Sequence, residues 1–228
     1  MPAEFDRYAA EYEELLRDPI RDGFAGDSRF YHERKWDLIR SFLDRRKQDT
    51  ARMRWLDVGC GKGELLRMGG DRFGHAIGCD PAREMAAGSQ VETVHQPDVT
   101  KLPFASSEFD FVTAVCVFHH VEPVSRCALV QEMARVLRPG GVVCLMEHNP
   151  WNPVTRLIVS RTPVDADAIL LSSGEVVQML RQARFGVLDK RYFLYLPRKL
   201  YRLAGGLEGL LAKAPAGGQY AVFAERLP

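Results

Sequence analysis

Three histidines stand where their side chains could exchange protons with a bound molecule. His119 and His120 are adjacent and follow the apolar run from Phe109 to Val117, and His148 ends a second such run directly after Glu147. An imidazole has an ordinary pKa near 6.5, so it changes charge close to neutral pH. We predict that His148, His120 or His119 acts as a general base. The alternative role for each is a packed histidine that bonds to loop backbone.

In the stretch from Trp55 to Leu65, which reads WLDVGCGKGEL, an apolar run is followed by three glycines at alternate positions. The glycines are Gly59, Gly61 and Gly63, and the apolar run before them ends in Asp57. Glycine tolerates positive φ and lets a ligand approach the backbone, and the helix that follows begins with free N–H groups. The spacing differs from the G-x-G-x-x-G dinucleotide fingerprint, and glycine rather than serine or threonine follows the lysine of the loop. The pattern therefore indicates another cofactor with a charged group.

Two further acids follow the next apolar segments. Asp80 precedes Pro81, and Asp98 precedes Val99. Ligands of parallel sheets bind at the carboxyl ends of the strands, and an acid at the end of the second strand can accept hydrogen bonds from two ribose hydroxyls. Capping of the helix that begins at Pro81 is the alternative role for Asp80, and both roles can hold together.

Strands and helices alternate along most of the chain, which predicts a doubly wound, Rossmann-like sheet. We expect seven strands, mostly parallel, with an antiparallel last strand, over residues 54–58, 74–79, 91–95, 109–117, 142–147, 187–196 and 219–225. Helices are expected over residues 63–68, 81–87, 124–137, 155–159, 172–183 and 199–213, after two helical patterns over residues 6–18 and 30–46. The turn Arg138-Pro139-Gly140-Gly141 is expected to end a helix.

The order of these motifs resembles the class I S-adenosylmethionine-dependent methyltransferases of the small-molecule type, and in particular the ubiquinone/menaquinone-like group. The D-x-G-x-G-x-G loop, Leu102-Pro103-Phe104, Phe109-Asp110 and the R-P-G-G turn carry the resemblance, which covers about residues 50 to 148. It implies S-adenosylmethionine as the cofactor and S-adenosylhomocysteine as the product. It also implies that Asp98 receives the adenine amino group, although Pro97 stands where family members often have glycine.

The resemblance further implies a set of cofactor contacts. Val99 would touch adenine through its backbone and Val117 would lie near the sulfonium, while Tyr8 and Tyr12 would lean on the methionine end. The alternative for the two tyrosines is an amphipathic core position. The expected cofactor-binding residues are Asp57, Gly59, Cys60, Gly61, Gly63, Asp80, Pro81, Asp98, Val99, Val117, Tyr8 and Tyr12.

Residues 1–48, 149–171 and 197–217 lie in the parts of this family that vary with the acceptor. Trp151, Arg156 and Arg161 are the expected substrate-binding residues, since arginine can hold a carboxylate or phosphate in a bidentate manner. Ion pairs of these arginines with Asp165 and Asp167 are the alternative. The leucine-rich segment 198–213 has basic ends and is expected to be a lid on an apolar acceptor, a core element or a weak membrane-surface contact.

Length and composition limit the domain organisation and the kinds of partner that can be expected. We expect one domain over 1–228, with a helical cap (1–48), a cofactor-binding core (50–148) and an acceptor-side half (149–228). The net charge of +1 argues against nucleic acid as a partner, and Arg34-Lys35 is expected on a solvated helix face. The five cysteines lack zinc-site spacing, so no metal is expected. With no signal peptide or membrane span in view, we expect a cytoplasmic monomer or homodimer.

These observations predict methyl transfer to a small or medium-sized metabolite, such as a natural product or a quinone-like or lipid-linked acceptor. Oxygen is favoured over nitrogen or carbon as the methylated atom. The alternatives are a nucleic-acid methyltransferase of the same fold and a non-catalytic domain that binds S-adenosylmethionine. Asn149-Pro150-Trp151 only partly matches the N-P-P-[YF] motif of base-methylating enzymes. The glycine spacing disfavours a nicotinamide oxidoreductase.

Overall fold

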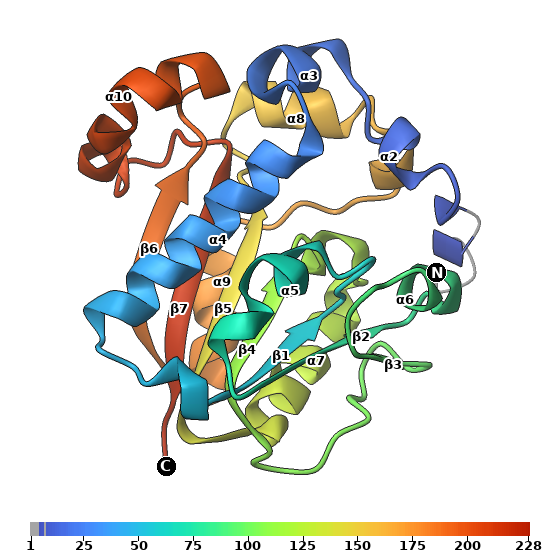
Figure 1. The fold of residues 1–228 in the computed structure, drawn as a ribbon, viewed down its shortest axis with the longest axis vertical. Coiled ribbons are helices and arrows are strands. Elements are labelled where there is room, and N and C mark those ends of the chain that lie inside the picture. Colours follow the sequence, from blue (N-terminus) through green and yellow to red (C-terminus); the bar gives the residue numbers. More distant parts are fainter. Residues whose placement is uncertain (1–4, 7) are drawn as a thin grey trace.

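A single seven-stranded sheet organises the computed structural model, which describes residues 5, 6 and 8–228. The strand order is β3-β2-β1-β4-β5-β7-β6, and β7 runs antiparallel to both of its neighbours. The pairs formed by β1 to β5 are parallel. Helices cover both faces of the sheet (Figure 1). The predicted doubly wound sheet with an antiparallel last strand is confirmed.

The strands are β1 (Arg54–Val58), β2 (His75–Asp80), β3 (Thr93–His95), β4 (Phe109–Val115), β5 (Leu137–His148), β6 (Phe185–Phe193) and β7 (Gln219–Arg226). The predicted bounds of β1 agree with the structure. β5 begins five residues earlier than predicted, because the R-P-G-G segment runs within the strand and not as a separate turn. The register between β4 and β5 shifts beside that segment, between Phe109 and Phe111.

The α-helices of the described chain are α2 (Tyr12–Leu15), α3 (Pro19–Ala25), α4 (Ser28–Arg45), α5 (Glu64–Gly69), α6 (Arg83–Ala87), α7 (Pro123–Val136), α8 (Pro153–Val159), α9 (Ser173–Gln182) and α10 (Arg198–Leu211). The predicted helix over 6–18 is shorter, since Asp18 starts a new helix at Pro19. Its Oδ1 accepts hydrogen bonds from the backbone N–H groups of Ile20 and Arg21, at 2.8 and 3.1 Å.

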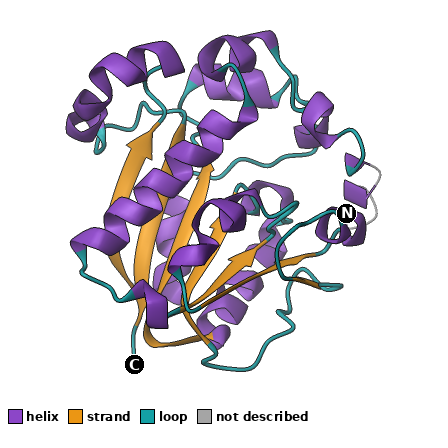
Figure 2. Cartoon of the chain, in the orientation of Figure 1, coloured by secondary structure: helices purple, strands orange, loops and turns teal. Residues whose placement is uncertain are grey.

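Two apolar cores form because successive strand residues point to opposite faces. Phe111 and Phe223 belong to the core beneath α4 and α5. Val112 and Val222 belong to the core beneath α7 and α9. Figure 2 shows the resulting three layers of helix, sheet and helix. Both faces of the sheet are therefore packed against helices.

Four helices, α2, α3, α8 and α10, lie beyond the carboxyl ends of the parallel strands (Figure 1). The prediction that Arg34 and Lys35 lie on a solvated helix face is wrong, because both residues of α4 are buried. Arg34 forms an ion pair with Glu208 of α10. Lys35 donates a hydrogen bond to the Sγ of Cys116, at 3.3 Å.

Candidate active site at the carboxyl ends of the strands

A cavity of about 390 Å³ lies where β1, β4, β5 and β6 end and β7 begins. Residues of α2, α3 and α8 close it from the opposite side. Its volume falls in the range of about 300–1,000 Å³ typical of small-molecule sites. The cavity is lined both by the glycine loop and by the three histidines predicted from the sequence, His119, His120 and His148.

The glycine loop forms one wall of the cavity because its backbone takes conformations that side chains would block. Gly59, Gly61 and Gly63 have φ values of +67°, +53° and +75°. A Cβ atom on Gly59 would lie 2.5 Å from the Cγ2 of Val117. The loop is tied to β2, where the carbonyl of Cys79 accepts hydrogen bonds from the N–H groups of Gly59 and Cys60.

Two buried acids support this loop. Asp80 accepts a hydrogen bond from the Gly61 N–H at 2.7 Å and another from the Ala82 N–H at 2.8 Å, one on each carboxylate oxygen. It therefore links the loop to the start of α6, next to Pro81. Asp57 lines the cavity and accepts a hydrogen bond from Thr113 at 2.5 Å. Burial, opposed by that bond and aided by the charge of Asp80, raises the pKa of Asp57 to about 7.

Some of the other predicted cofactor-binding residues line the cavity and others do not. Tyr12 and Cys60 line the cavity, and burial raises the pKa of the Tyr12 hydroxyl well above its ordinary value. Tyr8 lies outside the lining, in an edge contact with the ring of Phe5. Asp98 and Val99 also lie outside it. Asp98 is exposed, and its Oδ1 accepts hydrogen bonds from the backbone N–H and the hydroxyl of Thr100.

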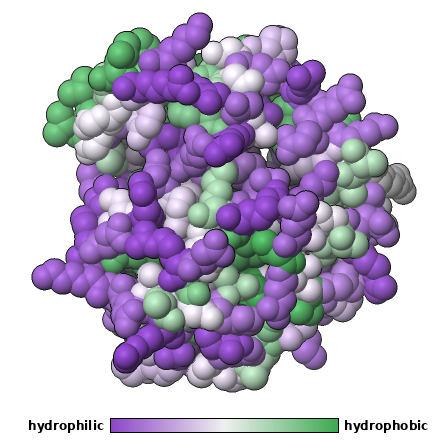
Figure 3. Space-filling view, viewed as in Figure 1, coloured by the Kyte–Doolittle hydropathy of each residue, from purple (hydrophilic) through white to green (hydrophobic). Residues whose placement is uncertain are grey.

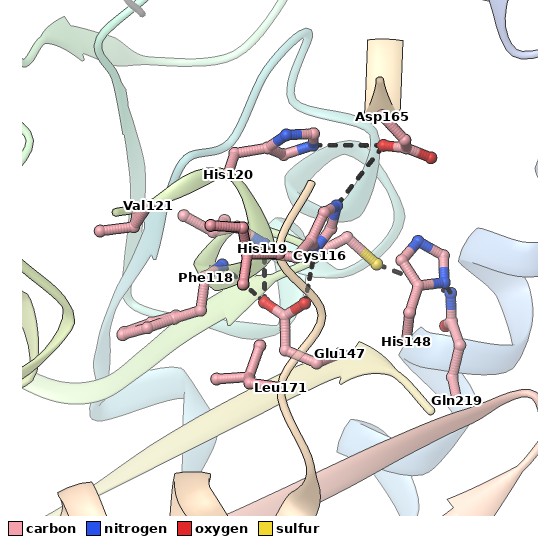
Figure 4. Close-up of polar contacts among 12 residues, drawn as sticks. Cys116, Phe118, His119, His120, Val121, Glu147, His148, Asp165, Leu171 and Gln219 are labelled. Atoms are coloured by element: carbon pink, nitrogen blue, oxygen red, sulfur yellow. Dashed lines mark hydrogen bonds and ion pairs between the residues drawn. The ribbon is translucent and has the colours of Figure 1, made fainter. Parts of the chain in front are cut away.

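A chain of charged groups runs through the histidine end of the cavity (Figure 4). The Nδ1 of His119 lies 2.6 Å from the Oε2 of Glu147, and both side chains are fully buried. On the other side, the Oδ1 of Asp165 lies 3.6 Å from the Nε2 of His119 and 3.4 Å from the Nε2 of His120. Glu147 also accepts hydrogen bonds from the N–H groups of Val117 and Phe118.

This chain gives the three histidines different protonation states. Burial opposes the charge on His119, but Glu147 and Asp165 outweigh it and raise the pKa of His119 to about 10. Burial lowers the pKa of His120, and Asp165 only partly offsets it. Burial and the charge of His119 lower the pKa of His148 to about 3. At neutral pH His119 is therefore a cation, while His120 and His148 are neutral.

A third group of polar atoms surrounds His148. Its Nδ1 lies 3.4 Å from the Nε2 of Gln219, which also donates to the Sγ of Cys116 at 3.6 Å. Cys116 has a φ of 58°, a backbone conformation that costs energy for a side chain other than glycine. Lys35 donates to the same sulfur, so one cation stands beside the histidines at the cavity wall.

The acceptor-side segment lines the cavity through other residues than those predicted. Trp151 and Arg156 are exposed and are not among the residues that line the cavity. The Nη1 of Arg161 lies 3.9 Å from the Oδ2 of Asp18. Within the described residues, no ion pair joins Arg156 or Arg161 to Asp165 or Asp167; Arg161 pairs with Asp18, and the partners of Asp165 are His119 and His120. The residues of this segment that do line the cavity are Asn152, Val154, Thr155, Ile158, Val159, Thr162 and Asp165.

His119, His120 and Asp165 also offer the donor types of a metal site. One donor atom from each lies within 4.8 Å of the others. The expectation that no metal set exists rested on cysteine spacing, and that pattern carries no information about a site built from η3 (Phe118–His120) and η4 (Pro163–Asp165). Asp165, Glu147, Lys35 and Gln219 were all missed as site residues. Glu147 lies at the end of β5 and Gln219 at the start of β7, while Asp165 lies in η4 and Lys35 in α4.

Comparison with known proteins identifies the cofactor-binding half. Residues 56–145 match the family model of the methyltransferase domain. The bovine probable tRNA methyltransferase 9B is 31% identical over 135 residues, which cover 56% of this chain and 28% of that protein. The demethylmenaquinone methyltransferase of Bacillus licheniformis is 32% identical over 134 residues, which cover 53% of this chain and 55% of that protein. The chain thus spans between a quarter and just over half of these relatives.

A solved structure extends the likeness to nearly the whole chain. The crystal structure of an S-adenosylmethionine-dependent methyltransferase from Thermotoga maritima, a possible histamine N-methyltransferase, matches with a TM-score of 0.68. The alignment covers 97% of each chain at 16% sequence identity, which shows a shared fold. Residues 56–145, which include the glycine loop, thus match a methyltransferase domain, and the chain shares its fold with a solved S-adenosylmethionine-dependent methyltransferase.

Proposed function

We propose that this domain methylates an oxygen atom of a small or medium-sized, partly apolar acceptor, with His120 as the general base. The single observation that carries the proposal is the position of Asp165. It brings His119 and His120 together in the wall of a cavity that the glycine loop also lines. The cavity therefore has a place for the cofactor and a place for an acceptor proton.

The residues at the glycine loop fit S-adenosylmethionine. The cofactor supplies a methyl group on a positively charged sulfur. Asp57 is a buried carboxylate at the cavity wall, so a cationic ligand would compensate the burial that raises its pKa. Asp80 is buried and is not among the residues that line the cavity, but its oxygens, which each accept one backbone N–H group, keep acceptor capacity for ribose hydroxyls. Tyr12 would cover the opposite side.

The cavity lining includes both apolar and polar side chains. Its apolar residues include Leu16, Phe24, Val154, Ile158 and Leu194. Its polar residues include the three histidines, Lys35 and Gln219. Such a cavity suits a molecule with a greasy body and one reactive polar group, because the body displaces water while the polar side chains orient the group.

The protonation states favour His120 over the other two histidines as the base. His119 already carries its second proton at neutral pH and cannot accept another. His148 is neutral, but its pKa of about 3 makes it a weak base. His120 is neutral, and the imidazolium that forms when it takes a proton would be stabilised by Asp165, 3.4 Å from its Nε2. Its remaining nitrogen, Nδ1, would accept the acceptor proton.

Product analysis tests this proposal. The purified chain is incubated with methyl-labelled S-adenosylmethionine and a nucleic-acid-free metabolite extract, and the products are separated by solvent extraction. We expect label in the organic phase, at a level that falls about 10²–10⁴-fold in His120→Ala. Label that resists solvent extraction would refute the proposed acceptor class. An unchanged rate of methyl transfer in His120→Ala would refute His120 as the base.

A nucleic-acid acceptor is the second candidate, and the relatives favour it. The bovine relative is named as a probable tRNA methyltransferase, which supports this candidate more directly than it supports a metabolite. Within this chain, Asn149 is not free for a base-binding role, because its side chain donates to the carbonyls of Pro215 and Gly217. Incubation with total tRNA separates the two candidates: label that precipitates with the tRNA and is released by ribonuclease supports the second.

A further inference from the structure

Helix α10 presents an apolar face that nothing within the described chain covers. Five leucines of this helix and its last turn are 45% to 86% exposed: Leu200, Leu203, Leu207, Leu210 and Leu211. The backbone of α10 breaks at Ala204, so Leu200 and Leu203 lie on the segment before the break and the other three leucines on the segment after it. Figure 3 shows apolar atoms gathered at the upper left of the molecule, over α10. Isolated exposed leucines are common on protein surfaces, but a contiguous set on one helix indicates a binding surface.

The opposite face of α10 is fixed, so the leucines cannot turn inward. Glu208 is 5% exposed and forms an ion pair with Arg34 of α4. Its Oε1 also accepts hydrogen bonds from the N–H groups of Tyr195 and Leu196, each at 2.9 Å. The guanidinium of Arg34 lies 3.6 Å from the ring centre of Tyr201. Rotation of the helix would break this buried network and leave charges without partners.

Basic residues flank the leucine face. Arg198, Lys199 and Arg202 stand in the first turns of α10, and Lys213 follows the helix. Arg198 forms an ion pair with Asp27 and Lys213 forms one with Asp189. Glu208 is the only acid of α10, and Arg34 neutralises it. Lys199 and Arg202 are exposed beside the leucines. An apolar face flanked by basic residues is the pattern of a helix that lies in the interface of an anionic bilayer.

We propose that α10 docks the domain on an anionic lipid surface, with the five leucines among the acyl chains and Lys199 and Arg202 at the headgroups. The cavity lies at the same end of the molecule: Leu194 and Tyr195 before α10, and Ala216 and Gly218 after it, line the cavity wall. Docking through α10 would therefore hold the acceptor end close to the bilayer. This proposal stands on the helix alone and does not depend on which acceptor is methylated.

Charge disfavours a second copy of the chain as the occupant. In a symmetric dimer the leucine face would meet its own copy, and the basic residues of both copies would surround one interface. Like charges would then repel across it. No helix of the described residues is long and apolar enough to span a membrane, so the contact proposed is one with the bilayer surface.

Sedimentation with vesicles tests the proposal on the full chain. We expect at least ten-fold stronger binding to phosphatidylglycerol vesicles than to phosphatidylcholine vesicles, and weaker binding at high salt. The double variant Leu203→Glu/Leu210→Glu should lose at least ten-fold in binding. The matched control is Val124→Glu, which changes an 84% exposed apolar residue of α7 and should bind as the wild type does. Circular dichroism checks that each variant is folded.

Two results would overturn the proposal. The first is equal binding of the wild type and the double variant to anionic vesicles. The second is that the wild type does not bind the vesicles, whatever oligomeric state light scattering then reports. A wild-type dimer that the double variant converts to a monomer would assign the face to a second copy of the chain.

Discussion

The Nδ1 of His119 lies 2.6 Å from the Oε2 of Glu147, with both side chains excluded from solvent. His119 comes from the turn after β4 and Glu147 from the end of β5, so the contact joins two neighbouring strands at their carboxyl ends. Burial disfavours the charge of Glu147, but the His119 cation and the backbone donors outweigh it and lower the pKa of Glu147. The pair is therefore ionic, and it fixes the turn that carries His120.

Glu147→Gln should destabilise the protein by about 3–5 kcal/mol, because it leaves the His119 cation without its buried partner. Urea unfolding followed by circular dichroism measures the change in the free energy of unfolding. The matched control is Glu225→Gln, whose partner Arg46 lies 2.7 Å away, with both side chains about one-third exposed. That variant should cost no more than about 1 kcal/mol. Equal costs for the two variants would show that the buried pair has no special role.

Gly59→Ala should weaken binding of S-adenosylmethionine at least ten-fold. The added Cβ would meet Val117 at 2.5 Å, and the φ of +67° is unfavourable for alanine. Calorimetric titration measures the affinity. Gly206→Ala is the control, since a Cβ there meets no atom within 4 Å. Wild-type affinity in Gly59→Ala would mean that the loop geometry does not set cofactor binding.

Affinity for S-adenosylmethionine should rise with pH between about 5.5 and 7. The pKa of Asp57 is raised to about 7 in the free protein, so the carboxyl is largely protonated at the lower pH. A cationic ligand favours the ionised form and lowers that pKa, so binding releases a proton below pH 7. Calorimetry in buffers of different ionisation enthalpy measures the release. Asp57→Asn should abolish this dependence, and its persistence in the variant would assign the proton to another group.

Kinetic measurements on variants should distinguish the roles of His120 and His148. His120→Ala should lower kcat about 10²–10⁴-fold while the Kd for S-adenosylmethionine changes less than threefold, as expected for loss of a base that does not hold the cofactor. Asp165→Asn should keep part of the activity and move the acidic limb of the pH profile to lower pH, because Asp165 raises the pKa of His120. A larger loss in His148→Ala than in His120→Ala would assign the base to His148.

The sequence predicted the fold better than it predicted the cluster of side chains around Asp165, for a physical reason. The fold and the bounds of β1 follow from local periodicity and from turn residues, which act over a few positions. The cluster at Asp165 depends on a contact between η3 and η4, which are more than 40 residues apart in the chain. Arg34 was misplaced for the same reason, since its partner Glu208 lies far along the chain and no local pattern marks it as buried.

Methyl transfer by the histidine variants tests the proposed acceptor and the proposed base most directly. Wild-type protein, His120→Ala and His148→Ala are each incubated with methyl-labelled S-adenosylmethionine and a lipid-containing, nucleic-acid-free extract. We expect label in a solvent-extractable product. The rate of labelling should fall about 10²–10⁴-fold in His120→Ala and by a smaller factor in His148→Ala. Label that appears only when tRNA is added, and that His120→Ala forms at the wild-type rate, would contradict both the acceptor and the base.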